Sequence, residues 1–544
     1  ITAEDLGGLE NSGSVTRTGA ELKAYWIDSA CSYKWHGQAA VRISAGLRET
    51  TLSTGQIETV GRRILRQLDA VSELNELPAM VYQLLLLSRH GSKQEIVSGI
   101  FSFFENLEQT NDTQALWDIE GTVMLHIGYS IKQDFELGQA LEIYAREQGD
   151  KLTAFSFACL LSLARVHRFS DAVMDVLRKL LVSSEHDCEA RAATVWARPY
   201  LAKASLDARK LLQAVAERAS FGWEQVTQAL VQLCLNTIDY TVTRRVSYSA
   251  GACAKTRLLC TDTLQTVYAM HTFVRAEIID QIMNRVVFQT DAHMHFIDLL
   301  QRLVADDIDT VRAHAPRIVD VLESIAVMAP STVSRLLQAA APLFLEDPQF
   351  RASLILVLRK ALFARGTDER RAALDGLFAL ITSTVQVSGT DAFDSQRLAV
   401  LLEILGLLRR SLTQQPEIRM AAYQRLAVLL DQPFALACSP LLNALYGMLA
   451  PEFAKFYQRD RTVDSPINIH QCINPATFRV TMPIAGFLLC YAKLVTALTA
   501  TPSNRNNSSS SSSGSAYKAA ADSWEDLCTR FAHAQIEDYE LDPN

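Results

Sequence analysis

Apolar residues recur along most of this chain at intervals that place them on one face of an α-helix. In the first clear example, Ile57, Val60 and Ile64 are separated by three and four residues, which matches the helical repeat of about 3.6 residues. A second helix is predicted from Leu77-Pro78 onward, because proline is tolerated in a first helical turn. Apolar helices and short polar breaks follow one another almost to the end, and no segment alternates with the period of two that predicts a strand.

The predicted helices form pairs that recur roughly every 35–50 residues, and each is too short to bury its own apolar face. Stacking of such pairs builds an α-solenoid. The sequence therefore predicts an all-α protein, an irregular α-solenoid of HEAT- or armadillo-like helix pairs with intervening helical domains. Turn-forming residues are scarce, with 23 glycines and 15 prolines among 544 residues, which disfavours sandwiches, barrels and propellers.

Three polar interruptions are candidate boundaries, at residues 109–118, 388–394 and 501–515. The last contains the serine run Ser508–Ser513 and cannot bury apolar area, so we expect it to be a disordered linker. The chain begins at Ile1 with no signal-like stretch and ends at Asn544 after a charged run. We therefore expect it to be a piece of a longer protein.

Net charge and cysteine usage limit the class of protein and the compartment in which it works. The 52 basic and 60 acidic residues give a net charge of −8, which excludes a histone-like polycation but not a local basic surface. The ten cysteines are scattered without a CxxC pair, so we expect buried free thiols in a reducing compartment. A long apolar run, Met482–Ala492, is shorter than the ~18–20 residues of a membrane span. The sequence predicts a soluble cytosolic or nuclear protein without membrane contact.

No motif for catalysis or for a cofactor is present. The chain contains no GxGxxG, GxxxxGK[ST], HExxH or GxSxG sequence, so nucleotide-binding, zincin and α/β-hydrolase activities lack their usual entry points. His293 and His295 are two residues apart, which on a helix points them about 200° from each other and prevents a shared metal. On a strand they could share one, but MHFIDLLQRLV has a helical period. We predict no catalytic residue, no metal and no cofactor.

Basic residues gather in three stretches, one of which is Arg62, Arg63 and Arg66. Residues 351–371 hold six basic residues against Asp368 and Glu369, and a second group follows VQLCLNTIDYTV. A solenoid aligns equivalent helices, so arginines distant in sequence could form one stripe for phosphates. The alternative is that each is a solvated helix face. The DNA-contact candidates are Arg244, Arg245, Lys255, Arg257, Arg359, Arg365, Arg370 and Arg371.

Several segments resemble one family. They are ILVLRKALFARGTDERRAALDGLFAL at Ile355–Leu380, LPAMVYQLLLLS, IEGTVMLHIGYSIKQDFELG, WEQVTQALVQL, EIIDQIMNRVV and the terminal IEDYELD. Together, and in this order, they resemble the Fanconi anemia group I (FANCI) family. The resemblance implies a large α-solenoid DNA-repair protein, longer than this chain at both ends. It implies a heterodimer with the paralogous Fanconi anemia group D-two protein on double-stranded DNA at interstrand crosslinks, in the nucleus and also the cytoplasm.

The resemblance also implies a four-part organisation. The expected parts are the end of a first solenoid at 1–118, a helical domain at 119–225, a second solenoid at 226–394 and a second helical domain at 395–544, which includes the linker 501–515.

Lys360 matches the lysine that the Fanconi core ubiquitin ligase modifies in this family. Leu354, Leu358 and Leu362 recur every four residues, which predicts a buried stripe that leaves Lys360 outside it. Taken alone, Lys360 is an ordinary solvated lysine. With ILVLRKALF intact around it, the resemblance identifies Lys360 as the ubiquitin acceptor in the second solenoid.

The family also carries a cluster of Ser-Gln phosphorylation sites shortly after this helix. Here Ser395-Gln396 in TDAFDSQRL stands near that place, and we expect a flexible loop accessible to a kinase. A single Ser-Gln pair also arises by chance, and the reduced cluster sets this chain apart from the family pattern. Ser395 is the phosphorylation candidate.

A HEAT-type transport or assembly adaptor without DNA binding is the alternative function. Such an adaptor would grip an acidic or helical peptide. A continuous basic stripe along the concave helices would favour DNA, whereas an apolar or acidic groove would favour the adaptor. A hydrolase would need a pocket of convergent titratable groups, and we expect none.

Overall fold

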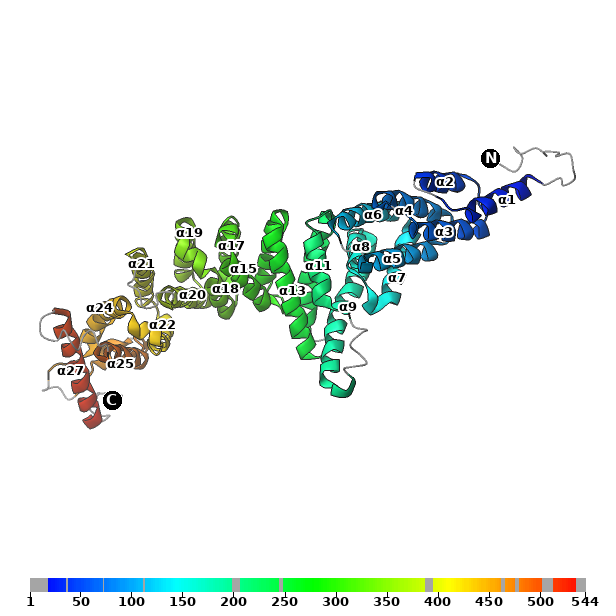
Figure 1. Cartoon of the computed structure of the whole chain (residues 1–544). Coiled ribbons are helices and arrows are strands. Elements are labelled where there is room, and N and C mark those ends of the chain that lie inside the picture. The colour runs from blue at the N-terminus through cyan, green and yellow to red at the C-terminus, as the bar shows by residue number, and fades with distance from the viewer. Residues whose placement is uncertain are drawn as a thin grey trace, which may run out of the picture. The chain divides into compact units, whose positions relative to one another are not determined.

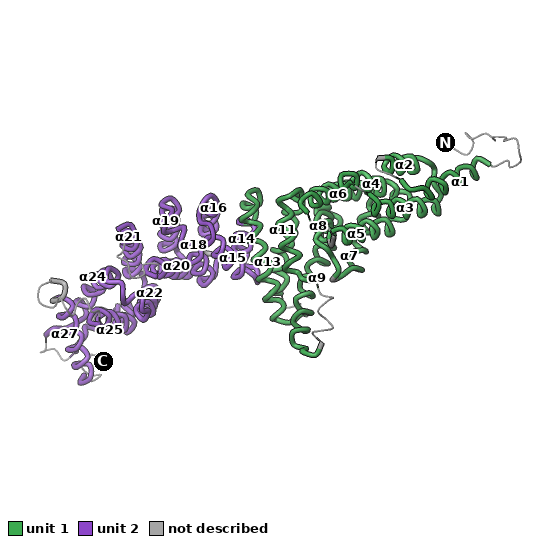
Figure 2. Tube along the Cα trace, viewed as in Figure 1, with its two compact units in different colours: residues 1–278 green, residues 279–544 purple. Residues whose placement is uncertain are grey.

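The protein is all-α, as predicted, and almost every described residue outside short connections is helical (Figure 1). The structure, a computed structural model, describes residues 18–35, 38–71, 73–110, 113–197, 206–243, 248–386, 395–460, 465–474, 479–500 and 512–534. The chain divides into two compact units, residues 1–278 (unit 1) and 279–544 (unit 2), coloured separately in Figure 2.

Unit 1 is built from helices that stack in two layers. Helix α4 packs between α2 and α6, and α5 packs between α3 and α7, so alternate helices share a layer. This is the packing of a solenoid. The helices are α1 (Gly19–Ser32), α2 (Gln38–Glu49), α3 (Thr54–Leu68), α4 (Leu77–Leu87), α5 (Lys93–Thr110), α6 (Gln114–Gln133), α7 (Phe135–Gln148), α8 (Ala154–Ala164), α9 (His167–Ala193), α11 (Ala208–Arg218), α12 (Glu224–Val242) and α13 (Ala250–Met270), with short 3₁₀ turns at Leu74–Glu76, Ser88–His90, Gly149–Lys151, Val195–Ala197 and Thr272–Val274.

Unit 2 repeats this arrangement. One layer runs through α15, α18, α20, α22 and α25, and the other through α17, α19, α21 and α24 (Figure 1). The helices are α15 (His293–Asp306), α16 (Ile308–Arg312), α17 (Ala315–Leu322), α18 (Pro330–Glu346), α19 (Pro348–Leu362), α20 (Thr367–Gln386), α21 (Ser395–Ser411), α22 (Pro416–Leu430), α23 (Pro433–Ala437), α24 (Ser439–Phe456), α25 (Ile484–Ala500) and α27 (Ser512–His533), and α14 (Arg275–Val287) spans the division between the units. A two-stranded antiparallel hairpin, β1 (Ile473–Asn474) and β2 (Arg479–Val480), lies between α24 and α25, and 3₁₀ turns occur at Ile325–Val327 and Ile469–Cys472.

Local start signals account for many helix positions. Proline occupies the first turn of α4, α17, α18, α19, α22 and α24, where its missing N–H costs nothing. Helix α15 begins at His293 and contains His295, which confirms the helical period predicted for MHFIDLLQRLV; the His293 ring contacts the Thr290 carbonyl and the Thr332 hydroxyl. In the described part of the chain, no helix combines the length and apolar character needed to cross a bilayer.

A buried charge cluster connects three helices of unit 1. Arg218, at the end of α11, places its Nη1 atom 2.6 Å from Glu108 Oε1 on α5 and 3.8 Å from Glu120 Oε2 on α6. Its guanidinium also lies over the rings of Trp117 and Trp223, 5.3 and 5.4 Å from their centroids. Since Glu120 is fully buried, the arginine is the cation that offsets the cost of placing that carboxylate in the core.

The structure differs from one predicted boundary and from the last residues of the predicted linker. A boundary after residue 118 would cut α6, which is continuous from Gln114 to Gln133 and packs against both α4 and α8. Of the predicted linker 501–515, residues 501–511 lie outside the described residues, while α27 begins at Ser512. Serine is tolerated in a helix that gains packing further along, and α27 packs against α25.

All ten cysteines are free thiols, and most are buried. Burial raises the pKa of the Cys490 thiol to about 12, which removes the reactive thiolate at neutral pH. We expect a maleimide at pH 7.5 to label the exposed Cys188 and Cys528 in the native protein, and Cys490 only after denaturation. Mass spectrometry of the digested protein identifies the labelled cysteines. Rapid labelling of Cys490 in the native protein would contradict the packing of α25.

Candidate functional site

Helix α19 carries the candidate acceptor lysine and has well-defined ends. The Asp347 carboxylate accepts hydrogen bonds from the backbone N–H groups of Gln349 and Phe350, at 2.8 and 3.3 Å, which caps the helix start. Arg359 and Lys360 occupy the last turn, where positive charge complements the helix dipole. The capped start and the buried face of α19 fix the direction in which the Lys360 side chain projects from the helix.

The buried stripe of α19 is confirmed. Leu354, Leu358 and Leu362 are each at most 1% exposed, whereas the side chain of Lys360 is 67% exposed. The Lys360 Nζ atom lies 3.9 Å from Glu323 Oε1, just after α17. An exposed pair of this length contributes little to stability and holds the amine loosely. The amine is therefore accessible on a rigid helix.

Two apolar side chains flank Lys360 on the exposed face of α19. Leu356, four residues before it, is 50% exposed, and Phe363, three residues after it, is 56% exposed. At these offsets the three residues lie on one side of the helix. Neither residue was predicted from the sequence, although an apolar residue outside the buried stripe was the available signal. They offer apolar contact area to a protein that approaches Lys360.

The basic residues around α19 separate into different environments. Arg359 and Arg365 are exposed, on the last turn of α19 and in the connection to α20. Arg371 is exposed on α20, in the other helix layer. Arg370 is buried: its Nε and Nη2 atoms donate to the Gly366 carbonyl and to Gln415 Oε1, at 3.3 and 3.1 Å. Arg370 is therefore removed from the DNA-contact candidates, because its guanidinium is used for contacts between α20 and the start of α22.

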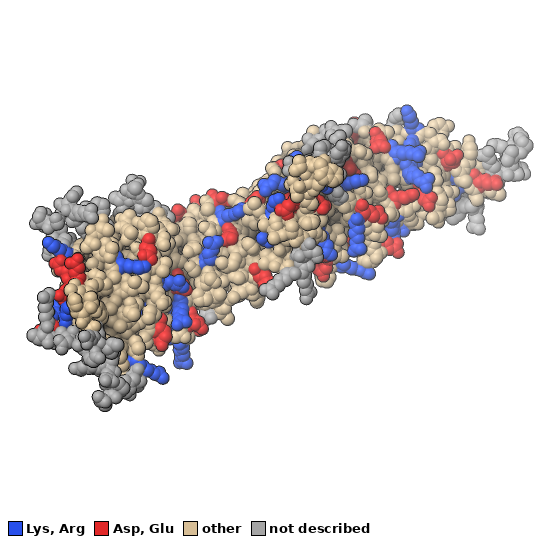
Figure 3. Space-filling model, turned by 90° about the horizontal axis from the view of Figure 1, so that it is seen from below, with Lys and Arg blue, Asp and Glu red and all other residues tan. Residues whose placement is uncertain are grey.

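The second basic group lies in unit 1. Lys255 and Arg257 are on α13. The Lys255 Nζ atom lies 3.7 Å from Glu189 Oε1, and Arg257 Nη1 donates to the Thr241 carbonyl at 3.4 Å. Arg244 and Arg245 lie outside the described residues. On the face drawn in Figure 3, basic and acidic side chains are interspersed over both units and form no continuous band.

Ser395 is the first residue of α21 and is exposed, whereas a flexible loop was predicted there. Serine favours helix starts because its hydroxyl can accept from nearby backbone N–H groups. The apolar face that begins at Val400 and Leu401 is buried, and its packing extends the helix back to this serine. The preceding residues 387–394 lie outside the described residues.

Comparison with known proteins gives a consistent result along the chain. Family models described as FANCI solenoid 1, FANCI helical domain 1, FANCI solenoid 2 and FANCI helical domain 2 match residues 9–132, 137–218, 226–378 and 379–544. Lys360 falls within the FANCI solenoid 2 match.

Similar proteins include the Fanconi anemia group I protein of Gallus gallus, 29% identical over 89% of this chain and 40% of that protein. The Fanconi anemia group I protein homolog of Mus musculus is 27% identical over 96% of this chain and 43% of that protein. The chain therefore spans about two fifths of the length of these relatives. Among solved structures, Kap121p bound to RanGTP aligns with a TM-score of 0.29 at 12% identity, covering 94% of this chain and 53% of that one.

Proposed function

Because the chain belongs to the family of Fanconi anemia group I proteins, we propose that it is part of a non-enzymatic DNA-repair scaffold that binds double-stranded or branched DNA and carries ubiquitin on Lys360. In this proposal the scaffold pairs with the paralogous group D-two protein at interstrand crosslinks. It works in the nucleus and also occurs in the cytoplasm.

The exposure of Lys360 is the observation that supports the acceptor role. A lysine that receives ubiquitin must present its amine to a thioester held by another enzyme, so its side chain has to be reachable. Lys360 is largely exposed, while the stripe behind it is buried. The core ligase complex is the proposed modifying enzyme, and Leu356 and Phe363 are exposed beside the amine.

Exposed arginines near Lys360 support contact with DNA phosphates. The side chains of Arg359 and Arg365 form no ion pair or hydrogen bond with any residue in the described ranges, so their charges are available to a polyanion. Phosphate contacts of this kind bind without sequence preference and weaken as salt rises, because bound counterions are released. The proposed DNA binding is therefore electrostatic.

Salt-dependent binding to duplex DNA tests this proposal. We expect the Arg359→Ala/Arg365→Ala variant to bind a duplex more weakly. The plot of the logarithm of the association constant against the logarithm of the salt concentration should become less steep by about two, since each phosphate contact contributes about one. Mobility-shift titrations at several salt concentrations measure the slope.

The matched control is Arg146→Ala/Lys179→Ala, which removes the same charge. Both residues pair with a carboxylate one helical turn away, Glu142 and Asp175 respectively, at 2.6 Å. The control should leave the slope unchanged. Duplex binding that does not respond to salt, or equal slopes for the two variants, would reject the proposed contact surface.

Phosphorylation of Ser395 is part of the same proposal. A phosphate on the first residue of α21 would add roughly −1.5 to −2 charges at a helix N-terminus, where negative charge interacts favourably with the helix dipole. Modification there would stabilise the start of α21 and alter the charge of the surface beside α19.

A further inference from the structure

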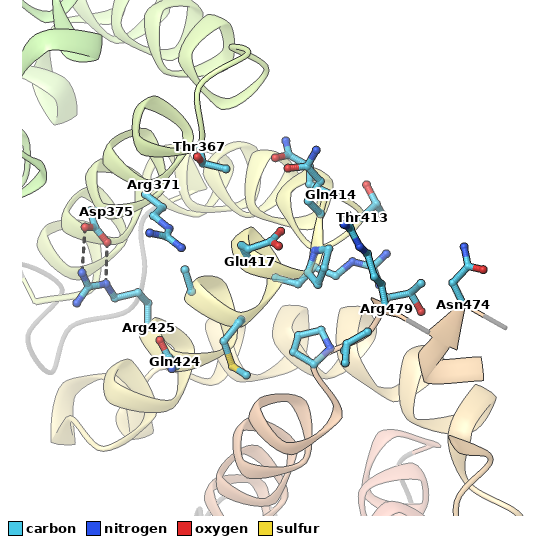
Figure 4. Close-up of a pocket in the computed structure, with 18 of the residues that line it drawn as sticks. Thr367, Arg371, Asp375, Thr413, Gln414, Glu417, Gln424, Arg425, Asn474 and Arg479 are labelled. Atoms are coloured by element: carbon cyan, nitrogen blue, oxygen red, sulfur yellow. Dashed lines mark hydrogen bonds and ion pairs between the residues drawn. The ribbon is translucent and has the colours of Figure 1, made fainter. Parts of the chain in front are cut away.

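A large groove in unit 2 is lined mainly by polar and basic side chains. It lies between α20, α22 and the β1–β2 hairpin, and its volume is about 2000 Å³ (Figure 4). Small-molecule pockets have volumes of about 300–1,000 Å³, so the groove suits a segment of a polymer better than a metabolite. Its walls come from segments more than 100 residues apart, with Thr367 at one end of that span and Pro483 at the other.

One of its four arginines is already neutralised. Arg425 on α22 donates from Nε and from the guanidinium end to the two carboxylate oxygens of Asp375 on α20, at 2.7 and 2.9 Å (Figure 4). This two-pronged ion pair links the two helices that form one wall. It contributes shape to the groove and little net charge.

The other three arginines leave the groove positive. The side chains of Arg371 and Arg479 form no ion pair or hydrogen bond with any residue in the described ranges. Arg419 contacts Met482 Sδ through Nη1, and its buried Nε atom has no hydrogen-bond partner among the described residues. Glu417 is the carboxylate in the groove without an ion pair among those residues. The groove therefore has unused capacity for anionic groups.

The neutral lining points to a peptide. Gln424 provides a side-chain amide, which can both donate to and accept from a peptide backbone. Met420, Val428 and Val480 provide apolar surface between the charged groups. The hairpin strands form a sheet of only two strands in the described residues, and short exposed strands can pair with an extended peptide.

Nucleic acid fits the same groove poorly. Proteins that bind single-stranded nucleic acid combine a basic groove with aromatic side chains on which the bases stack, and no aromatic residue lines the groove in the described part of the chain. Glu417 would also oppose a backbone that carries a charge on every nucleotide, whereas a peptide can place an apolar residue beside it. We infer that the groove binds an extended acidic peptide segment of a partner protein, a function separate from the proposed DNA binding.

Binding of a defined peptide tests the inference. The probe is a fluorescein-labelled synthetic peptide in which Asp-Glu pairs alternate with single valines, measured by fluorescence anisotropy. We expect Arg371→Glu/Arg479→Glu to weaken binding about tenfold or more, because two attractive contacts become repulsive. We expect Glu417→Gln to strengthen binding about threefold, because one repulsive charge is removed.

Misfolding cannot increase the affinity for the peptide, so a stronger affinity in Glu417→Gln distinguishes a direct charge effect from a loss of structure. The matched control is Arg409→Glu/Arg410→Glu on α21, which makes the same charge change at exposed positions outside the groove and should alter affinity by less than about twofold. Equal losses in the two double variants would overturn the inference, as would unchanged affinity in Glu417→Gln. If oligothymidine binds through Arg371 and Arg479 while the peptide does not, the groove is a nucleic-acid site and the inference is wrong.

Discussion

Replacement of Arg218 by methionine is expected to lower the free energy of unfolding of unit 1 by about 3–5 kcal/mol, the usual cost of removing one partner from a buried ion pair. Methionine keeps a long apolar side chain between Trp117 and Trp223 but removes the cation. Glu120, which is fully buried, and Glu108, which is mostly buried, then face each other without a positive charge. The loss arises from those two carboxylates.

Urea unfolding followed by tryptophan fluorescence measures this effect. Five of the six tryptophans precede residue 279, so the signal reports mainly on unit 1. Arg209→Met on the same helix is the control, because Arg209 is 62% exposed and lies 3.5 Å from Asp262; its effect should stay within about 0.5 kcal/mol.

The double variant Arg218→Met/Glu120→Gln separates charge from packing. It should recover part of the lost stability, since the buried carboxylate is replaced by a neutral amide. If Arg218→Met unfolds at the same urea concentration as the unmodified protein, the cluster does not hold α5, α6 and α11 together.

Replacement of Lys360 by arginine is expected to abolish ubiquitin conjugation. Arginine keeps the positive charge and the contact with Glu323, and the buried side of α19 is untouched. A guanidinium, however, stays protonated and cannot attack the ubiquitin thioester as a lysine amine does. The measurement is a reconstituted reaction with the proposed core ligase and the proposed group D-two partner, read by gel shift and by mass spectrometry of the ubiquitin remnant.

Lys455→Arg on α24 provides the matched control, because Lys455 is also largely exposed and pairs with Glu452 at 2.8 Å. It should conjugate at the normal rate. If Lys360→Arg is modified as efficiently as the unchanged protein, or the remnant maps to another lysine, the acceptor assignment is wrong.

Neighbouring residues show where sequence reasoning reached its limit. Arg370 and Arg371 are indistinguishable in the basic cluster, yet one is buried between α20 and α22 and the other is exposed in the groove. Successive helical residues point about 100° apart, so the position of the next helix in the layer decides which of the two side chains is buried. Ser395 illustrates the same limit, because the buried face of α21 carries the helix back to a serine that stands in a polar stretch.

The sequence by itself determined the class of the fold, the starts of many helices and the exposed side of α19. These follow from local rules: the helical repeat of apolar residues, proline and carboxylate signals at helix starts, and a leucine stripe that excludes Lys360. The tertiary structure alone decided which charges meet. Arg218 finds Glu108 and Glu120 from two other helices, and Arg371, Arg419 and Arg479 come together from α20, α22 and a hairpin. These contacts between charged side chains depend on how the helices stack, and stacking is set by contacts between residues far apart in the chain.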